Sequence, residues 1–511
     1  MDRTRIVGAG RECLRDRTET LVSLLTRRFS IDTRALAALR IAIGAIILAD
    51  LAFRASDLGL FYTGPGLYPL DVHGAVYGSA GTYSLYALSD ALRVQATLFL
   101  VAGCFAFAFL VGYRTRFVGA VSLVFLLSLH VRNPAVLNGG DRLLWVLLLL
   151  GLLTPLGERW SIDSLCRSGS VRETALGVGT VALLIQPLVV FTSNAIRKAR
   201  GEHWFAGDAL SIALANDAMT RSTADLLSGV PPLVTGLNYV WVALLAGSVP
   251  LLFGTSGRIR TLTVSAYLAA FAGMAATMTV GLFPFVLAAS VLPFLPASAW
   301  DRLERRVPTR RIADRTRHPP FDPERSFEGP SRIGDRPRSV PGRPLGRSST
   351  AAVRPLLLSA VAVVVLLWLL TFAAFGVVDR EPPPPLDADA LDQQGWGLYA
   401  PDPGDSYSRY VLEAELESGD RIDALDGGPV RYDRPPDDGA RHRSFMQTVA
   451  ASADGSVDRA VADRYARWAC ERAGTHAADV ERVTLLRLRH TGLPDGSESP
   501  HRSTVVESPC R

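Results

Sequence analysis

Long runs of apolar residues limit this 511-residue chain to very few fold classes. A helix needs about 20 residues, at a rise of about 1.5 Å each, to cross a hydrocarbon core about 30 Å thick. Runs such as ALAALRIAIGAIILADLAF and LLLSAVAVVVLLWLLTFAAF are long enough. The pattern predicts an all-α polytopic membrane helix bundle with nine spans, at about 34–54, 95–113, 116–132, 142–157, 174–197, 237–254, 259–280, 282–298 and 355–377.

Arginine marks one side of the predicted bundle. Cytoplasmic loops of membrane proteins carry an excess of basic residues, and the loops 113–116, 157–173 and 254–260 all carry arginine. This places the N-terminus in the cytoplasm. The net charge of +5 is attributed to these loops, so the expected partner is the lipid bilayer and no nucleic acid. The arginine-rich start of the chain has no A-x-A-like cleavage site, which predicts no cleavable signal peptide.

Composition divides the chain into five parts. A basic cytoplasmic segment, 1–33, precedes a transmembrane domain of about eight spans, 34–298. Residues 299–354 are rich in Pro, Arg, Gly and Ser, which predicts a disordered basic cytoplasmic linker. A ninth transmembrane helix, 355–377, then exports residues 378–511. The predicted location is the cell membrane, with many passes and an extracytoplasmic C-terminal domain.

Three longer connections fall on the outer side of the predicted bundle. They are 55–94, 131–142 and 197–236, and the third contains the semi-apolar stretch FAGDALSIALANDAM, which is too short to span. Short amphipathic helices at the outer interface are the expected form. Together they could roof a cavity between the helices.

The C-terminal region predicts a small α+β domain. The stretch SRYVLEAELESGDRIDAL alternates apolar and polar residues around Ser418-Gly419-Asp420, which indicates a hairpin. VDRAVADRYARWACERA has helical periodicity, and VERVTLLRLRH indicates another strand. Cys470 and Cys510 either pair in an oxidising compartment or stay as buried thiols. The region has no catalytic triad or metal-ligand spacing, and no metal site is predicted.

The chain contains a single lysine, Lys198, among 54 Lys and Arg residues. It lies at the predicted outer end of the fifth span, in VFTSNAIRKARGEHW. One interpretation is structural: the ammonium reaches lipid headgroups, or pairs with Glu202 or Asp208. The other is chemical: in a partly dry cavity a lysine can lose its proton and act as a base, whereas an arginine stays protonated.

Other polar residues are expected at the same depth of the membrane. Asp50 and Arg54, four residues apart, can pair on one face of the first span. Polar residues in the fifth span suggest a helix that faces protein or water instead of lipid. Each has a structural alternative, such as a turn, a helix cap or an ion pair. The further candidates are His130, Asn138 and Asp141 in the turn HVRNPAVLNGGDR, and Gln186 and Asn194 in the fifth span.

The order of short motifs resembles a known family. The chain carries, in this order, FYTGPGLYP, GYRTRFVGAVSLVFLLSLHVRNPAVLNGGDRLL, GERWSIDSL and FTSNAIRKARGEHWFAGDAL. This order resembles the HTTM family, the horizontally transferred transmembrane domain shared with the vitamin K-dependent gamma-carboxylase. The resemblance covers about residues 30–300, and RWSIDSL and the lysine followed by Trp204 are its most specific parts. GWGLYAPDP and the strands after it resemble the outer tail of many prokaryotic members.

The resemblance implies a role for the lysine. In the carboxylase the matching lysine is the base that deprotonates the hydroquinone of vitamin K, so this role falls on Lys198. The implied cofactor or substrate is a reduced quinone, and the candidates to bind it are Gln186, Asn194 and Trp204. The implied activity is that of a carboxylase-like or quinol-dependent lyase or oxygenase.

The chain departs from the carboxylase at one position. A histidine important to the carboxylase falls near Asn138 to Asp141, where this chain has none. His130 lies upstream and His203 lies near the lysine, and both are kept as catalytic candidates.

Two hypotheses follow. The chain is a membrane enzyme that uses Lys198 as a base on a lipid-soluble, quinol-like substrate, or a non-enzymatic membrane protein that handles lipids or solutes or anchors the outer domain. The observation that discriminates between them is where the Lys198 side chain points. An apolar-walled pocket beside Asn138, Asp141 and the outer-face helices favours the enzyme. A solvated amine paired with Glu202 favours the anchor.

Overall fold

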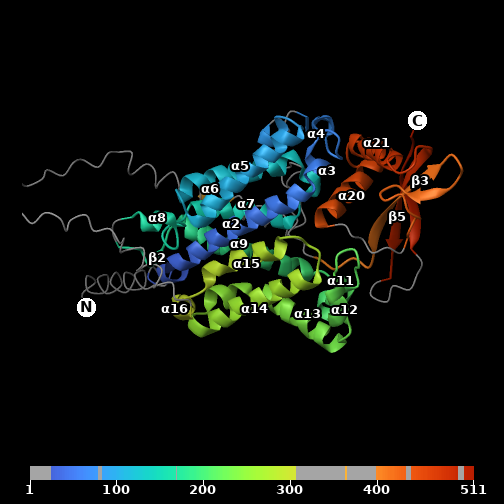
Figure 1. Ribbon diagram of the computed structural model, residues 1–511. Helices are drawn as coiled ribbons and strands as arrows, with labels where there is room; N and C mark the ends of the chain where they lie inside the picture. The colour runs from blue at the N-terminus through green and yellow to red at the C-terminus, as the bar shows by residue number, and fades with distance from the viewer. Residues whose placement is uncertain are drawn as a thin grey trace, which may run out of the picture.

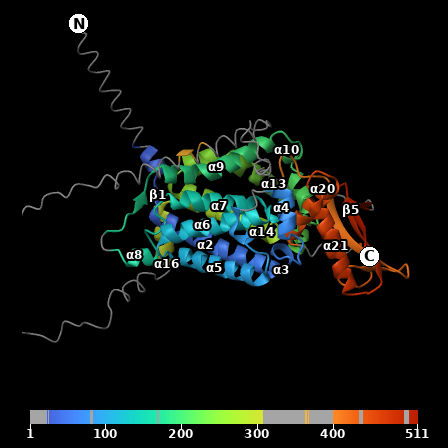
Figure 2. The same cartoon turned by 90° about the horizontal axis from the view of Figure 1, so that it is seen from above.

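The structure is a computed structural model that describes residues 23, 25–78, 83–167, 170–306, 363–364, 367, 399–432, 439–492 and 500–510. Long helices lie side by side, and a small sheet with two helices from the C-terminal region lies at one end of them (Figures 1 and 2). The chain is therefore mostly helical with a sheet near its C-terminus, as the sequence predicts.

Five helices are long and apolar enough to cross a membrane, which is typical of an integral membrane protein. They correspond to five of the predicted spans and are α2 (Thr33–Ser56), α5 (Leu92–Val111), α6 (Thr115–Arg132), α9 (Val178–Lys198) and α14 (Gly257–Thr277). Helix α5 packs between α2 and α6, so these three form a layer of neighbours in chain order.

The other three spans predicted within 34–298 are wrong in length or continuity. Helix α7 (Gly139–Leu152) has 14 residues, about 21 Å at 1.5 Å per residue, and is too short for a full crossing. Helix α13 (Pro231–Ala246) meets α12 (Ser222–Ser228) at a bend of 101°. Helix α15 (Phe283–Val291), with the turn that follows it, meets α16 (Ala297–Arg306) at 109°. Counting each bent pair as one span gives up to seven in the described residues.

Prolines explain both bends. Val230 and Leu295 precede Pro231 and Pro296, and their ψ angles of 74° and 125° are not helical. A proline ring disfavours the α conformation in the residue before it. The bend before Pro231 lies ahead of the predicted span 237–254. The bend before Pro296 lies inside the predicted span 282–298, where the apolar sequence continues through the proline.

The predicted linker, 299–354, begins later than expected. Residues 299–306 belong to α16, and Arg34 at the start of α2 donates hydrogen bonds to Asp301 and Glu304 at 2.7 and 3.0 Å. These ion pairs fix a segment whose composition predicts disorder. The predictions that fall outside the described residues are those for 1–22, for 307–354, and for 355–377 except Val363, Val364 and Leu367.

The three long connections form short helices, as predicted. They are α3 (Leu58–Tyr62), α4 (Leu70–Tyr77), η2 (Leu85–Ala87), η3 (Pro134–Val136), α10 (His203–Ala206), α11 (Ala209–Leu214) and α12. Three elements at the opposite end of the long helices were not predicted from the sequence. They are the paired strands β1 (Ile31–Asp32) and β2 (Thr174–Ala175) and the short helix α8 (Ile162–Leu165).

The C-terminal region is a four-stranded antiparallel sheet with two helices. Its strands are β3 (Tyr407–Leu416), β4 (Arg421–Asp423), β5 (Val480–His490) and β6 (His501–Pro509), in the order β4-β3-β5-β6. The predicted hairpin at 418–420 is confirmed as β3–β4, the predicted helix as α21 (Ala460–Gly474) and the predicted strand as β5. Helix α20 (Ala440–Ala453) and strand β6 were not predicted.

Side chains alternate between the two faces of the sheet, and the buried ones show which face is covered. Leu412 pairs with Leu485 and Ala414 with Val483, and all four are buried. Residues directly opposite in an antiparallel pair share one face. This face carries α21, which also packs against α20.

The C-terminal region docks on the short helices at one end of the long ones. Helix α20 packs against η3, and α21 packs against α4. Arg464 of α21 donates hydrogen bonds to the carbonyl oxygens of Pro65 and Gly66 at 2.7 and 2.8 Å. The turn FYTGPGLYP therefore forms part of the docking surface.

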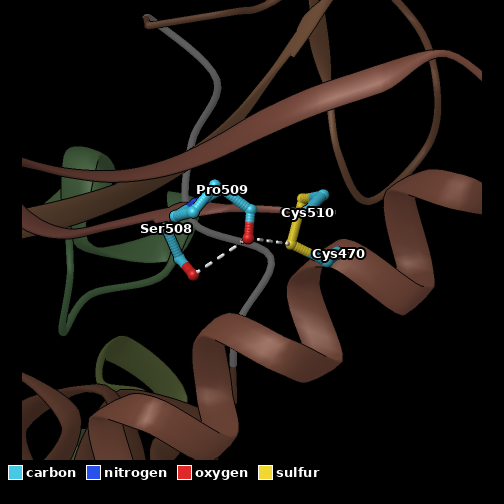
Figure 3. The surroundings of a disulfide bond; sticks show 4 residues. All are labelled: Cys470, Ser508, Pro509 and Cys510. Atoms are coloured by element: carbon cyan, nitrogen blue, oxygen red, sulfur yellow. Dashed lines mark hydrogen bonds between the residues drawn. A yellow bond between two sulfur atoms is a disulfide. The ribbon is translucent and has the colours of Figure 1, made fainter.

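A disulfide joins Cys470 to Cys510, which decides between the two alternatives that the sequence leaves open. Figure 3 shows that it links helix α21 to the chain just after β6, next to Pro509. It ties the last strand, at the edge of the sheet, to the helix that covers the sheet.

Thiol labelling tests this link. In denatured but unreduced protein we expect iodoacetamide to modify Cys104 and Cys166, which are free, and to modify Cys470 and Cys510 only after a reductant is added. The Cys470→Ser, Cys510→Ser double variant should lose about 4 kcal/mol of stability in the C-terminal region, because the crosslink closes a separation of 40 residues. Modification of Cys470 before reduction, mapped by mass spectrometry, would contradict the disulfide.

Candidate functional site

The single lysine is buried at the end of helix α9. The Lys198 side chain is among the largest fully buried in the described residues, and the residue is 1% exposed. Its Nζ donates a hydrogen bond to the carbonyl oxygen of Tyr399 at 3.1 Å and lies 3.4 Å from the centroid of the Trp204 ring. Trp204 Nε1 donates to the same carbonyl at 2.9 Å. One backbone oxygen thus joins the lysine and the tryptophan.

The Tyr399 carbonyl is supplied by a short segment, Tyr399–Asp402, which we term the strap. The Asp402 carboxylate accepts hydrogen bonds from the backbone N–H groups of Glu202 and His203, at 2.7 and 3.1 Å. A Cβ on Gly201 would collide with this carboxylate, so a larger residue there would force Asp402 to shift. The strap therefore anchors the turn that carries Trp204.

Helix α13 supports the same turn from the other side. Asn238 is fully buried, and its Nδ2 donates to the carbonyl oxygen of Trp204 at 2.8 Å. Its Oδ1 accepts from the backbone N–H of Leu210 at 3.2 Å. Trp204 is therefore held by groups from α13 and from the strap, which keeps its ring face against the lysine.

The two other candidates on α9, Asn194 and Gln186, lie at different depths along the helix. Asn194 lies one turn before Lys198 on α9 and is fully buried. Gln186 is also buried, but 12 residues of helix place it about 18 Å from Lys198 along the axis, too deep to share a site with the amine.

His203 points away from the buried lysine. Its Nδ1 lies 3.0 Å from Asp208 Oδ2, and its side chain is 43% exposed. The hydrogen bond with Asp208 raises the pKa of the imidazole above its ordinary value. Asp208 is therefore the ion-pair partner of His203.

A second cluster surrounds Arg54, whose side chain has no exposure to solvent. Its Nε donates to Asp50 Oδ2 at 2.8 Å, one NH group donates to Asp141 Oδ1 at 2.7 Å, and the other donates to the Tyr62 hydroxyl at 2.8 Å. The predicted Asp50–Arg54 pair is thus confirmed. Arg441 from helix α20 bonds to the other oxygen of Asp50.

Asn138 and Asp141 place this cluster at the start of α7. Asn138 Oδ1 accepts from the backbone of Gly140 at 2.7 Å, and Asp141 Oδ2 accepts from the backbone N–H of Asn138 at 2.8 Å. This is a capping box, which the sequence analysis gave as a structural alternative for Asp141. His130 is buried beside it, with Nε2 3.8 Å from Asp141 Oδ1.

The cluster does not suit a metal ion in this arrangement. Asp50, His130 and Asp141 each offer one atom within 4.8 Å of the others, the spacing of a possible metal site in the described residues. However, both oxygens of Asp50 and both of Asp141 already accept hydrogen bonds, three from guanidinium groups and one from a backbone N–H. A cation would have to displace Arg54, whose positive charge occupies the centre.

A cavity of about 870 Å³ adjoins this cluster. Apolar side chains of α2 and α15, including Phe53 and Phe283, form its walls, and Asp50 and Asp141 lie at its base. Residues 439–442, at the start of α20, close it from the C-terminal region. The lining is mixed, because the charged residues Asp50, Asp57, Asp141, Arg221 and Arg441 line the cavity together with these apolar side chains. Asn138 also lines it, whereas Lys198 is not among its lining residues, so the lysine side chain lies outside this cavity.

A short chain of contacts links the cavity to the lysine. The Tyr399 hydroxyl donates to Met219 Sδ at 3.5 Å, and Met219 O accepts from the backbone of Thr279 at 2.8 Å. Thr279 lines the cavity. Tyr399 therefore contacts Lys198 through its carbonyl and Met219 through its hydroxyl, and Met219 in turn contacts Thr279 at the cavity.

Sequence reasoning missed the contributions of the C-terminal region. Tyr399 and Asp402 lie in the motif GLYAPDP, which was noted only as part of an outer tail, and no pattern indicated that it covers the lysine. Arg441 follows a Pro- and Asp-rich stretch and carries no distinguishing signal.

Comparisons with known proteins add no identification: no protein-family description, no curated protein and no solved structure matches this chain.

Stability measurements test the Arg54 cluster. Asp141→Asn keeps the shape of the side chain but leaves the buried guanidinium without one counter-charge, so we expect a loss of about 3–5 kcal/mol in the free energy of unfolding. Thermal unfolding of the purified protein in detergent measures it.

An exposed pair provides the control. Arg482 and Glu507 lie 2.6 Å apart, with side chains 45% and 49% exposed, so Glu507→Gln should change stability by at most about 1 kcal/mol. Equal losses in the two variants would show that the Arg54 cluster is not a buried ionic network.

Proposed function

We propose that this chain is a multi-pass membrane enzyme, related to the HTTM family that its motifs resemble, in which Lys198 acts as a general base on a lipid-soluble, quinol-like substrate. The observation that carries the proposal is the enclosure of the single lysine, 1% exposed, by Trp204 and the strap. A chain that otherwise uses arginine retains at this position the one long cationic side chain that can give up its proton.

Burial of the amine supports a chemical role over a lipid anchor. A lysine that binds headgroups extends its amine to the membrane surface, whereas Lys198 lies under the Tyr399 carbonyl and the Trp204 ring. The cavity of about 870 Å³ beside the Arg54 cluster has room for a quinone-sized substrate. Lys198 does not line it, and Tyr399, Met219 and Thr279 lie between the two. Asp50 and Asp141 at its base provide polar groups that can orient a substrate hydroxyl.

The strap has to move for this reaction to occur. A base must come within about 3 Å of the proton that it removes, and the Tyr399 carbonyl occupies that position beside Nζ. Displacement of Tyr399 would expose the amine towards Met219 and the rim of the cavity. Lys198 Nζ would then accept the proton of the substrate hydroxyl.

A specific observation favours a second, non-enzymatic function. The face of a tryptophan ring attracts an ammonium group, and a carbonyl oxygen accepts a hydrogen bond from it. The same contacts would let Lys198 act as a clamp that holds the C-terminal region on the helices. In that case the protein presents this region to a partner, or handles lipids in its cavity.

The proposed topology has the N-terminus and the 299–354 linker in the cytoplasm and the C-terminal domain outside the cell membrane. The arrangement of contacts supports it. Helix α16 bonds to Arg34 at the start of α2, whereas Arg441 bonds to Asp50 near its end, about 24 Å away along the helix. A crossing at 355–377 would connect these two ends.

Cysteine accessibility tests this topology. A membrane-impermeant maleimide added to intact cells should label an engineered cysteine at Ser418, in the β3–β4 turn, and should not label one at 310–345. Permeabilised cells should label both and serve as the control for reagent and expression. The reverse pattern in intact cells would overturn the orientation.

The base hypothesis predicts that Lys198→Arg is folded and inactive. In air-saturated buffer, where dissolved O₂ is the oxidant, the wild-type protein in nanodiscs should accelerate the oxidation of a reduced short-chain menaquinone, followed by absorbance. Lys198→Arg should abolish this acceleration, because arginine stays protonated and cannot take the proton of the quinol hydroxyl. Thermal unfolding checks that the variant is folded.

Arg200→Gln is the matched control, since it removes a neighbouring positive charge and should retain activity. Full activity of Lys198→Arg would end the base hypothesis and leave the clamp. Absence of activity in the wild-type protein would reject the quinol substrate.

A further inference from the structure

The strap over the lysine contains a residue in a strained backbone conformation. Tyr399 has a φ angle of 56°, in the left-handed region that residues other than glycine rarely adopt. Such a conformation persists only where the surroundings hold it in place, and it is frequent at ligand clamps and switch regions. The carbonyl of Tyr399 is the oxygen that Lys198 and Trp204 share. The strained residue is thus the one that contacts the amine.

Asp402 fixes the other end of the strap to the turn that follows α9. Its two carboxylate oxygens each accept one backbone hydrogen bond, from Glu202 at 2.7 Å and from His203 at 3.1 Å. Hydrogen bonds to an ionised acceptor are stronger than those between neutral groups. The same turn carries Trp204, whose ring lies against Lys198. One carboxylate therefore holds the strap and the lysine site together.

Gly201 leaves the space that this carboxylate occupies. A Cβ on Gly201 would lie 2.4 Å from both oxygens of Asp402, and the three atoms nearest to it all belong to Asp402. The φ angle of Gly201 lies outside the left-handed region, so its backbone accepts alanine. Gly201→Ala would therefore act on the strap, by pushing the carboxylate away from the two N–H groups.

The chain after the strap is fixed by separate contacts at the start of β3. The Tyr407 hydroxyl and Arg409 donate to Asp217 Oδ2, at 3.1 and 3.0 Å, on the loop after α11. Gly404 and Asp405, which lie between these contacts and the strap, are exposed. Because the sheet has its own contacts with the loop, loss of the carboxylate contact would release the strap while the sheet stays docked.

We propose that the strap is a lid on Lys198 and that Asp402 is the latch that keeps this lid closed when no substrate is bound. The closed lid supplies the amine with a hydrogen-bond acceptor and keeps water-soluble electrophiles away from it. Opening relieves the strained conformation of Tyr399, which offsets part of the cost of breaking the latch. The role of the lid rests on the base function proposed above, whereas its opening is measured by access to the amine, so the two proposals can fail separately.

Acylation of Lys198 measures the state of the lid, because the chain has a single lysine. Full-length protein in nanodiscs is treated with a charged, water-soluble succinimidyl ester, and the modified fraction of Lys198 is followed over time by mass spectrometry. Asp402→Ala removes the latch, and Gly201→Ala displaces it while the carboxylate is kept. Each should raise the acylation rate about tenfold or more above that of the wild type, since each removes hydrogen bonds to a charged group.

A matched variant separates the latch from a general loss of charge. Asp405→Ala removes an exposed carboxylate three residues after the latch, and its Lys198 should react at the wild-type rate. Thermal unfolding shows that each variant is folded at the temperature of the reaction. Faster acylation in both latch variants, with no change in Asp405→Ala, supports the lid. The wild-type rate in folded Asp402→Ala and Gly201→Ala, or an equal rise in Asp405→Ala, would overturn the proposal.

Discussion

One buried guanidinium organises the end of the molecule where the candidate sites lie. Arg54 is completely enclosed and bonds to Asp50 on its own helix and to Asp141 at the start of α7. An unpaired ion in such a place costs several kcal/mol, so the two carboxylates must stay where they are. The start of α7 is thereby fixed against the end of α2, which sets the base of the cavity.

The C-terminal region also makes fixed contacts with the ends of the long helices. Arg441 takes the remaining oxygen of Asp50, and the strap places the Tyr399 carbonyl on Lys198. Two separate contacts thus join the long helices to a region that lies more than 200 residues later in the chain. The cavity lies along this junction, and Arg443 of α20 donates to the carbonyl oxygen of Thr279, which lines it.

Local patterns in the sequence predicted the local parts of the structure. The pairing of Asp50 with Arg54 depends on residues four apart, and the strand Val480–His490 and the helix of Cys470 depend on periodicity, so a single segment contains the information. The bend before Pro231 lies ahead of the predicted span 237–254, and the bend before Pro296 was missed because hydropathy averages over the proline. The shortness of α7 was missed for the same reason, since leucines continue beyond its end.

Long-range contacts could not be predicted in this way. The sequence analysis singled out Lys198, Trp204 and Asp141, and the structure places the first two in direct contact and the third at the cavity. Their partners Tyr399 and Arg441 come from distant segments, and nothing in the periodicity of those segments specifies what they touch.

The central claim is that Lys198 is enclosed from water and reachable by a lipid-soluble quinone. Because the chain has one lysine, acylation of a lysine side chain reports on this position alone. The decisive measurement compares two reagents on the folded protein in nanodiscs, a charged water-soluble succinimidyl ester and a succinimidyl ester attached to a naphthoquinone, with modified sites mapped by mass spectrometry. The account predicts that only the quinone reagent modifies Lys198, and that free menaquinone suppresses the reaction. Modification of Lys198 by the water-soluble reagent at the rate of an exposed lysine, or none by the quinone reagent, would contradict it.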